Sequence, residues 1–159
     1  MQFSISKIGV LFGIVFLHST CVKKNQYSVV PALTYQSYQV FSHSEDNKTI
    51  ADSAYITFNF QDGDGDLGTS DNSKPSLFLK YYEDQGNGFV YLSKCDSIFI
   101  PSLTPKGSNK EIEGTFVQII KPAPIYNIFT SFPYQWRVTM IDRAGHESNV
   151  IQTPSQTKL

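Results

Sequence analysis

The sequence predicts an all-β domain, a sandwich of seven or eight short antiparallel strands. From Tyr27 onward, apolar residues alternate with polar ones, which is the period of a strand with one buried face. Gly, Pro, Asn or Asp interrupts this alternation at short intervals, and no stretch keeps the period of a helix. Because no helix is available to cover a sheet, two sheets must cover each other.

The predicted strands follow one another along the chain. In strand 54–61, Ile56, Phe58 and Phe60 fall on one face and the polar residues between them fall on the other. Strands 76–82 and 88–93 form a hairpin, because the glycines between them permit a positive φ. Prolines punctuate the later gaps, where a missing N–H costs no ladder hydrogen bond, and residues 122–132 could hold one helical turn. The strands are residues 32–41, 54–61, 76–82, 88–93, 97–100, 111–119, 134–141 and 148–153.

The composition fits one folded domain and excludes one class of partner. The chain has 159 residues, of which 40% are hydrophobic and 14% aromatic, enough for a core and too many for a disordered chain. Lys7 is the only charged residue before Cys21, so the remainder carries 12 of the 13 basic side chains and all 14 acidic ones. This balance lacks the basic surface that nucleic-acid binding requires, and we expect no nucleic-acid partner.

The first 20 residues are predicted to be a signal peptide. Residues 8–17 form an uncharged apolar run, too short for a bilayer span of about 20 residues. The next residues, 18–24, resemble the lipobox of bacterial lipoproteins, in which the first residue after cleavage is a cysteine that carries a diacylglyceryl group. This resemblance, which extends in overall plan to the lipoproteins of the Bacteroidota, implies lipidation of Cys21. The alternative is an ordinary secretory signal, although residues 18–22 contain no Ala-x-Ala site.

Lipidation would divide the chain into a signal peptide (1–20), a lipid-anchored tether (21–31) and a sandwich domain (32–159). Acyl chains contribute about 0.8 kcal/mol per buried methylene, so they hold a protein on a membrane without a transmembrane helix. We therefore expect the protein in the bacterial cell envelope, at the outer membrane or cell surface. Cys95 would then lack an intrachain disulfide partner, and we expect it to be a small buried apolar residue.

The last two predicted strands resemble the final hairpin of fibronectin type III and related immunoglobulin-like domains. In those domains an alternating strand begins near a tyrosine, ends in an aspartate and is followed by a turn with Gly and Ser. The resemblance implies that the sandwich of seven or eight antiparallel strands is immunoglobulin-like. It also implies that Tyr134 could be a corner tyrosine that bonds upstream backbone, with a plain edge tyrosine as the alternative. The residues that carry it are Tyr134, Trp136, Val138, Met140, Asp142, Gly145, Ser148 and Asn149.

An acidic loop, Asp62-Gly63-Asp64-Gly65-Asp66-Leu67-Gly68, follows strand 54–61 directly. Three carboxylates on a glycine-rich backbone offer the hard oxygen ligands that calcium prefers. An EF-hand does not fit, because Leu67 falls where that motif needs its turn glycine and Ser73 where it needs its bidentate glutamate. The same run resembles a feature of many uncharacterised Bacteroidota lipoproteins, which implies no activity.

The predicted fold would add a second loop to this site. In a sandwich of the immunoglobulin type, the loops after the second and sixth strands lie at the same end. That arrangement would bring Asp142, with Glu147 or Asn149, towards Asp62, Asp64 and Asp66, and a cation would relieve the repulsion among the carboxylates. The predicted metal ligands are Asp62, Asp64, Asp66 and Asp142. The alternative is a soluble turn without metal, since Asp and Gly are common turn residues.

Nothing in the sequence supports catalysis. His43 lies in a polar stretch and His146 in the last turn, and neither has a nucleophile motif beside it. No glycine-rich segment continues into the Lys-Ser or Lys-Thr of a phosphate-binding loop. We therefore expect no catalytic residues, and a small metal-dependent hydrolase built on the acidic loop is the alternative.

The sequence thus predicts a noncatalytic, lipid-anchored binding or interaction module of the cell envelope, stabilised by calcium. Its binding residues and its protein or glycan partner stay unidentified, and a structural subunit of a surface assembly is a further alternative. Exposed tyrosines on strands 76–82 and 88–93 could form a platform for sugars or proteins. Cross-strand packing is the competing interpretation of these tyrosines.

Overall fold

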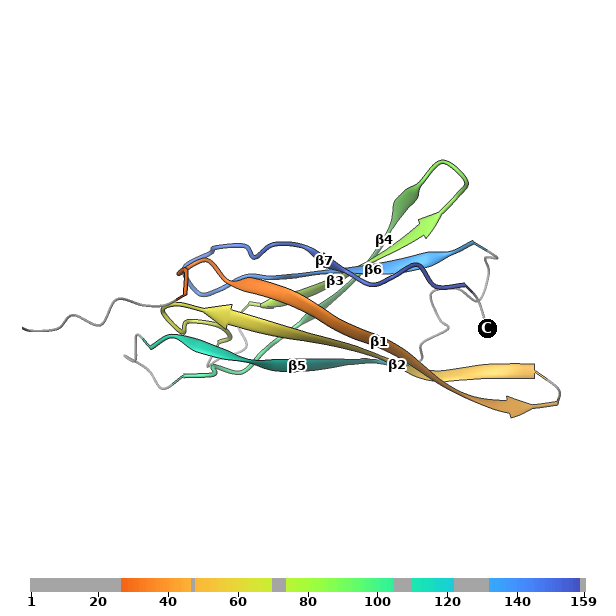
Figure 1. Ribbon diagram of the computed structural model, residues 1–159, viewed down its shortest axis with the longest axis horizontal. Coiled ribbons are helices and arrows are strands. Elements are labelled where there is room, and N and C mark those ends of the chain that lie inside the picture. The colour runs from red at the N-terminus through yellow and green to blue at the C-terminus, as the bar shows by residue number, and fades with distance from the viewer. Residues whose placement is uncertain (1–26, 47, 70–73, 105–109, 122–131, 158–159) are drawn as a thin grey trace, which may run out of the picture.

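The computed structural model describes residues 27–46, 48–69, 74–104, 110–121 and 132–157 (Figure 1). Within these residues the chain forms seven strands in two antiparallel sheets and no helix. The predicted all-β sandwich is therefore confirmed, and its immunoglobulin-like identity stays a prediction. The signal peptide, Cys21, the first part of the tether and residues 122–131 lie outside the described residues. Among the residues that are described, no helix has the length and apolar character needed to cross a membrane.

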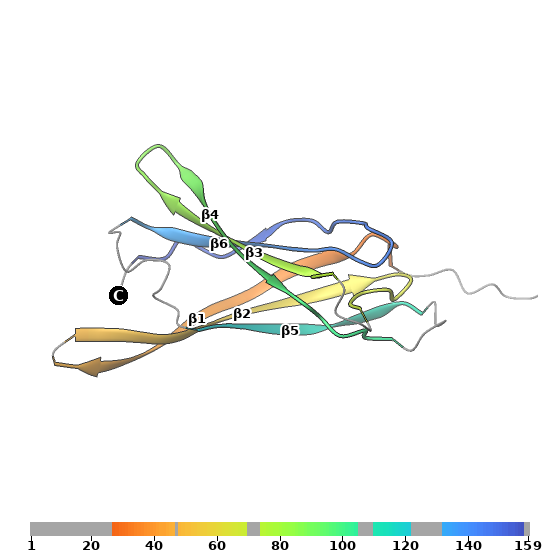
Figure 2. The same ribbon diagram turned by 180° about the vertical axis from the view of Figure 1, so that it is seen from behind.

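Seven strands make the two layers of the sandwich. One sheet has the order β1-β2-β5 and the other has the order β4-β3-β6-β7, with antiparallel pairing throughout. Figures 1 and 2 show the sheets lying against each other. The bounds are β1 (Ala32–Glu45), β2 (Lys48–Asp62), β3 (Leu77–Asp84), β4 (Phe89–Ile98), β5 (Ile112–Ile120), β6 (Tyr134–Met140) and β7 (Ile151–Gln152).

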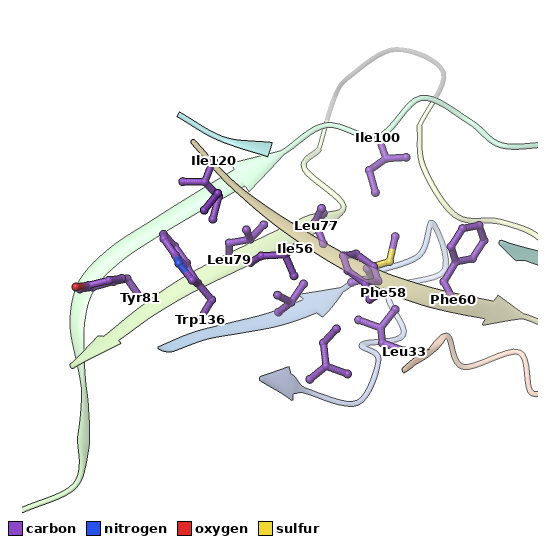
Figure 3. Close-up of a cluster of buried hydrophobic side chains, with 14 of the residues drawn as sticks. Leu33, Ile56, Phe58, Phe60, Leu77, Leu79, Tyr81, Ile100, Ile120 and Trp136 are labelled. Carbon is purple, nitrogen blue, oxygen red and sulfur yellow. The ribbon is translucent and has the colours of Figure 1, made fainter. Parts of the chain in front are cut away.

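The core lies between the sheets and is filled by alternate residues of the inner strands. In β3, buried residues alternate with partly exposed ones along the whole strand, as expected for a sheet with one covered face. Trp136 of β6 packs edge-on against Tyr81 of β3, with ring centroids 5.3 Å apart (Figure 3). Phe58 of β2 stacks on Phe116 of β5 at 5.4 Å. Burial of each large apolar side chain stabilises the fold by about 1.5–3 kcal/mol.

Two strand predictions were wrong. The predicted strand 97–100 is the end of β4, which continues from Phe89 to Ile98. The chain continues through a bulge, marked by a positive φ of 55° at Ser93 and a register shift opposite it in β3. The predicted strand 148–153 shrinks to the two residues of β7. Here side chains replace the ladder, since Ser148 Oγ accepts from the Met140 amide and Thr153 Oγ1 accepts from the Trp136 amide.

The structure also bears on three expectations about single side chains, of which the burial of Cys95 was wrong. Cys95, expected to be buried, is exposed, because it pairs with Lys80 on the outward face of the sheet. The Tyr134 hydroxyl lies 3.2 Å from the hydroxyl of Tyr38, across the sandwich, and the described contacts show no corner bond to upstream backbone.

Tyr82 and Tyr91 face each other across β3 and β4, with ring centroids 5.5 Å apart. This is the cross-strand packing that was the alternative to an open platform.

The two ends of the sandwich differ. Segment 27–31 enters the domain at the end where β2 finishes, and the Ser28 carbonyl accepts a hydrogen bond of 2.8 Å from the Gly63 amide. The β1–β2 and β3–β4 turns extend at the opposite end (Figures 1 and 2). In the second of these turns Asp84 Oδ1 accepts from the amides of Gly86 and Gly88, which confirms the predicted hairpin.

Candidate metal centre

The acidic loop begins at Asp62, the last residue of β2, and is fixed from several sides. Leu67 is fully buried and anchors the loop in the core. The Asp66 amide donates a 2.9 Å hydrogen bond to Asp62 Oδ2, which folds the loop back on its own start. The Thr104 hydroxyl donates to the Gly65 carbonyl at 2.6 Å. The loop is therefore a packed part of the fold, in contact with the core, with its own start and with Thr104.

The two glycines between the aspartates of the loop cannot be replaced by a larger residue without a clash. A Cβ on Gly63 would overlap the Tyr27 carbonyl oxygen and would lie 2.8 Å from that of Ser28. Gly65 has a φ of +70°, and a Cβ there would overlap the Lys110 carbonyl. Neighbouring backbone therefore presses on the loop at both glycines, which only residues without a side chain permit. The glycines of the Asp–Gly pattern therefore allow close packing of the loop backbone against its neighbours. The three aspartate side chains between them converge on one point.

Three carboxylates meet inside the loop. One oxygen from each of Asp62, Asp64 and Asp66 can be chosen so that all three lie within 4.8 Å of one another. The Oδ1 atoms of all three residues are buried and have no hydrogen-bond partner among the described residues. In contrast, Oδ2 of Asp62 accepts from the Asp66 amide, and Oδ2 of Asp66 accepts from the Ala144 amide at 3.0 Å. Asp62 and Asp66 thus use one oxygen to hold the backbone and leave the other without a donor.

Burial and mutual repulsion make the charged cluster unfavourable. Burial, followed by the charges of Asp64 and Asp66, raises the pKa of Asp62 to about 6. Burial, followed by the charge of Asp142, also raises the pKa of Asp66. Arg143 partly offsets this effect at Asp66, but its guanidinium donates to the Gly68 carbonyl and the Ser102 hydroxyl. Buried polar atoms normally have hydrogen-bond partners, so a positive group placed among these three oxygens would offset the cost of their burial.

Asp142 lies next to this cluster, but its carboxylate accepts hydrogen bonds from His146. The loop after β6 does meet the acidic loop, as the Ala144 amide and Asp66 carboxylate show. The side chain of Asp142 is fully buried, and its two oxygens accept from the backbone amide and the Nδ1 atom of His146, each at 2.8 Å. That hydrogen bond, with the charge of Asp142, raises the pKa of His146. Of the four predicted ligands, three form the cluster and Asp142 braces the adjacent loop.

The other two predicted contributors are also placed by the structure. The side-chain amide of Asn149 accepts from the Leu33 amide at 2.7 Å and donates to the Leu33 carbonyl at 2.9 Å, so it fastens β1 to the other sheet. Glu147 is exposed, and its residue forms an isolated bridge with Ile141. Neither side chain belongs to the acidic cluster.

The arrangement suits a hard cation. Calcium lies about 2.3–2.6 Å from its oxygen ligands, so two oxygens on the same ion are at most about 5 Å apart. The observed limit of 4.8 Å among the three carboxylates satisfies this condition. Calcium takes six to eight oxygens, and backbone carbonyls and water normally complete such a set. The carboxylate oxygens present therefore fit calcium. Asp62, Asp64 and Asp66 are the residues that would bind it.

Sequence reasoning missed the residues that support the loop from outside. Thr104 and Tyr27 lie far from Asp62 in the chain, and no motif links them to the loop. Comparison with protein-family models, with curated proteins and with solved structures gave no significant match. The role of the cluster therefore has to be argued from its own chemistry.

Proposed function

We propose that this protein is a noncatalytic, calcium-stabilised β-sandwich module, anchored in the bacterial cell envelope by lipid on Cys21. Its task is to hold an interaction surface at the membrane for a protein or glycan partner. The observation that carries the calcium part is the set of three buried, unpartnered Oδ1 atoms on Asp62, Asp64 and Asp66.

A structural role for the ion is favoured over a catalytic one. A catalytic metal keeps a coordination position open to substrate. Here the unpartnered oxygens have almost no solvent-accessible surface, and Asp62 is fully buried at the end of β2. The loop closes over its own carboxylates. This supports a clamp, by which we mean an ion that holds the acidic loop 62–68 in its folded conformation. The alternative, a small metal-dependent hydrolase, would need this loop to open.

The position of the clamp suggests what it stabilises. Gly63, inside the acidic loop, bonds to Ser28 of the entering chain. On the same side, the Tyr27 hydroxyl donates to Glu113 Oε2 at 2.7 Å. An ion bound between Asp62 and Asp66 would rigidify the loop against which segment 27–31 packs. Calcium would thus fix the orientation of the domain relative to segment 27–31, with the β1–β2 and β3–β4 turns at the opposite end of the sandwich (Figure 1).

Lipid anchoring is supported by the apolar run 8–17 and by the lipobox resemblance at Cys21. A membrane anchor raises the effective concentration of the module near other envelope components. Holding a binding surface in place is then a sufficient function for a domain without catalytic machinery.

Calcium binding is tested by titration calorimetry of metal-free protein, with Asp64→Asn as the site variant and Asp84→Asn as the control. Asp84 is an aspartate at the opposite end of the sandwich, and its replacement keeps an acceptor for the Gly86 and Gly88 amides. We expect one calcium per chain in the wild type and in Asp84→Asn, and a large loss of affinity in Asp64→Asn. Equal binding by all three proteins, or no binding at millimolar calcium, would refute the site.

Anchoring is tested independently by fractionating cells that express the wild type or Cys21→Ala. We expect the wild type in the membrane fraction, labelled by radioactive palmitate, and the variant in the soluble fraction without label. A variant that stays in the membrane fraction would refute lipid anchoring and leave the calcium proposal standing.

A further inference from the structure

Strand β5 forms an open edge of the β1-β2-β5 sheet. Its pairing with β2 runs without a register shift from Asp62 opposite Ile112 to Ala54 opposite Ile120. No other described strand pairs with its outer side, and Figures 1 and 2 show it at the border of the sheet. Residues 114–120 contain no charge and no proline. Such a regular, uncharged edge is a template for pairing with another strand.

The other three edge strands carry features that discourage pairing. At the start of β1, Asn149 occupies both backbone groups of Leu33, and a bulge follows between Tyr35 and Ser37. Strand β4 has its bulge at Ser93 and includes charged residues. Strand β7 has two residues and is followed by Pro154. Bulges, charges, proline and short length are the usual protections of sheet edges, and between Gly114 and Ile120 strand β5 has no bulge, no charge and no proline.

An apolar patch lies on the outward face beside this open edge. It consists of Phe41, Tyr55, Val117 and Ile119. Tyr55 pairs directly with Ile119 across the strands, and its ring centroid lies 4.7 Å from that of Phe41. Val117 is 50% exposed and Ile119 is 42% exposed, which is unusual for large apolar side chains at neighbouring outward positions of one strand. The patch reaches the edge at β5, so a strand added there would extend it.

Two opposite charges flank the uncharged segment of β5. Glu113 precedes it and Lys121 follows it, and both are exposed. If two β5 strands pair antiparallel about a two-fold axis at Val117, residue Thr115 of one copy faces Ile119 of the second. In the same register Glu113 of each copy faces Lys121 of the other. One register therefore pairs Val117 with Val117 of the second copy, sets Ile119 against Thr115 and forms two ion pairs.

We propose that two copies of this chain associate through β5, forming a continuous six-stranded antiparallel sheet centred on Val117. The two-fold axis makes the interface isologous and closed, so the edge is used once and no fibre can grow from it. The backbone hydrogen bonds provide affinity, and the flanking charges fix direction and register. This inference rests on β5 and does not require calcium, although Glu113 also accepts a hydrogen bond from the Tyr27 hydroxyl.

Disulfide trapping tests the register. In a chain with Cys21→Ser and Cys95→Ser, the variant Val117→Cys places two thiols opposite each other, with Cα atoms about 4.5–5.5 Å apart, within reach of a disulfide. The matched variant Thr115→Cys places its thiols about 13 Å apart along the strands, beyond reach. We expect cross-linked dimer for the first and little for the second under mild oxidation. Equal cross-linking of both would overturn the register.

Sedimentation velocity over roughly 1–100 µM tests association itself. We expect a concentration-dependent dimer for the Cys21→Ser/Cys95→Ser chain, and a monomer when Val117→Lys adds like charges at the axis, with an unchanged circular dichroism spectrum. Lys121→Glu should weaken dimerisation by roughly tenfold, and Lys121→Glu with Glu113→Lys should restore most of it. A monomer across the whole range, or a dimer that persists in Val117→Lys, would overturn the proposal.

Discussion

Replacing Asp62 by Asn should stabilise the metal-free protein at neutral pH. The pKa of Asp62 in the fold is about 6, against an ordinary value of 3.8. A shift of about two units corresponds to roughly 3 kcal/mol, because each unit is worth about 1.36 kcal/mol. Asn keeps an oxygen to accept from the Asp66 amide and removes one charge from the cluster. In chelator at pH 7.5, Asp62→Asn should therefore unfold at a temperature higher by roughly 10 °C.

The pH dependence follows from the direction of the shift. Because the pKa is higher in the folded state, the folded chain binds more protons than the unfolded chain between about pH 3.8 and pH 6. The contribution of Asp62 to the free energy of unfolding therefore falls as pH rises through this window, and the full cost is present above about pH 6. The advantage of Asp62→Asn should shrink at pH 4.

Calcium should offset the difference in stability between Asp62→Asn and the wild type. An ion that binds only the folded state raises the free energy of unfolding by about 2.7 kcal/mol at 100 times its dissociation constant. We expect this gain in the wild type and little of it in Asp62→Asn, so calcium should close the gap. The assay is urea unfolding followed by the fluorescence of Trp136, the single tryptophan. If the variant is less stable than the wild type in chelator and responds equally to calcium, Asp62 neither destabilises the metal-free fold nor binds calcium.

Three further substitutions test the surrounding structure. Gly63→Ala should cost about 2–3 kcal/mol because its Cβ would overlap the Tyr27 carbonyl, and an unchanged melting temperature would count against this packing. Asn149→Ala should cost about 1–3 kcal/mol and speed amide hydrogen exchange at Leu33, whose two backbone groups it leaves unpaired; unchanged exchange would show that the contact is dispensable. Trp136→Ala should cost about 3–5 kcal/mol because the side chain is 1% exposed, and a loss below about 1 kcal/mol would contradict its burial.

The fold could be predicted because its signals are local. Alternation placed Ile56, Phe58 and Phe60 on one face, and all three are buried in the core. The errors arose where side chains or bulges replace the regular ladder. Nothing in the sequence shows that Ser93 adopts a positive φ and lets β4 continue, or that Ser148 takes the place of a strand partner.

The candidate site was predictable in part for the same reason. Asp62, Asp64 and Asp66 are neighbours in sequence, so their convergence follows from the loop. The second loop was placed correctly beside them, since strand order alone decides which loops share an end. The role of Asp142 depends on side-chain geometry, because His146 takes both of its oxygens, and sequence carries no signal for that choice.

In the proposed site, the three buried carboxylates of Asp62, Asp64 and Asp66 hold one calcium ion. A crystal structure of the protein grown with calcium, with anomalous diffraction data, tests it most directly. We expect a single anomalous peak about 2.3–2.6 Å from Oδ1 of Asp62, Asp64 and Asp66. Absence of an anomalous peak at these oxygens, with water or a lysine ammonium in their midst, would contradict it.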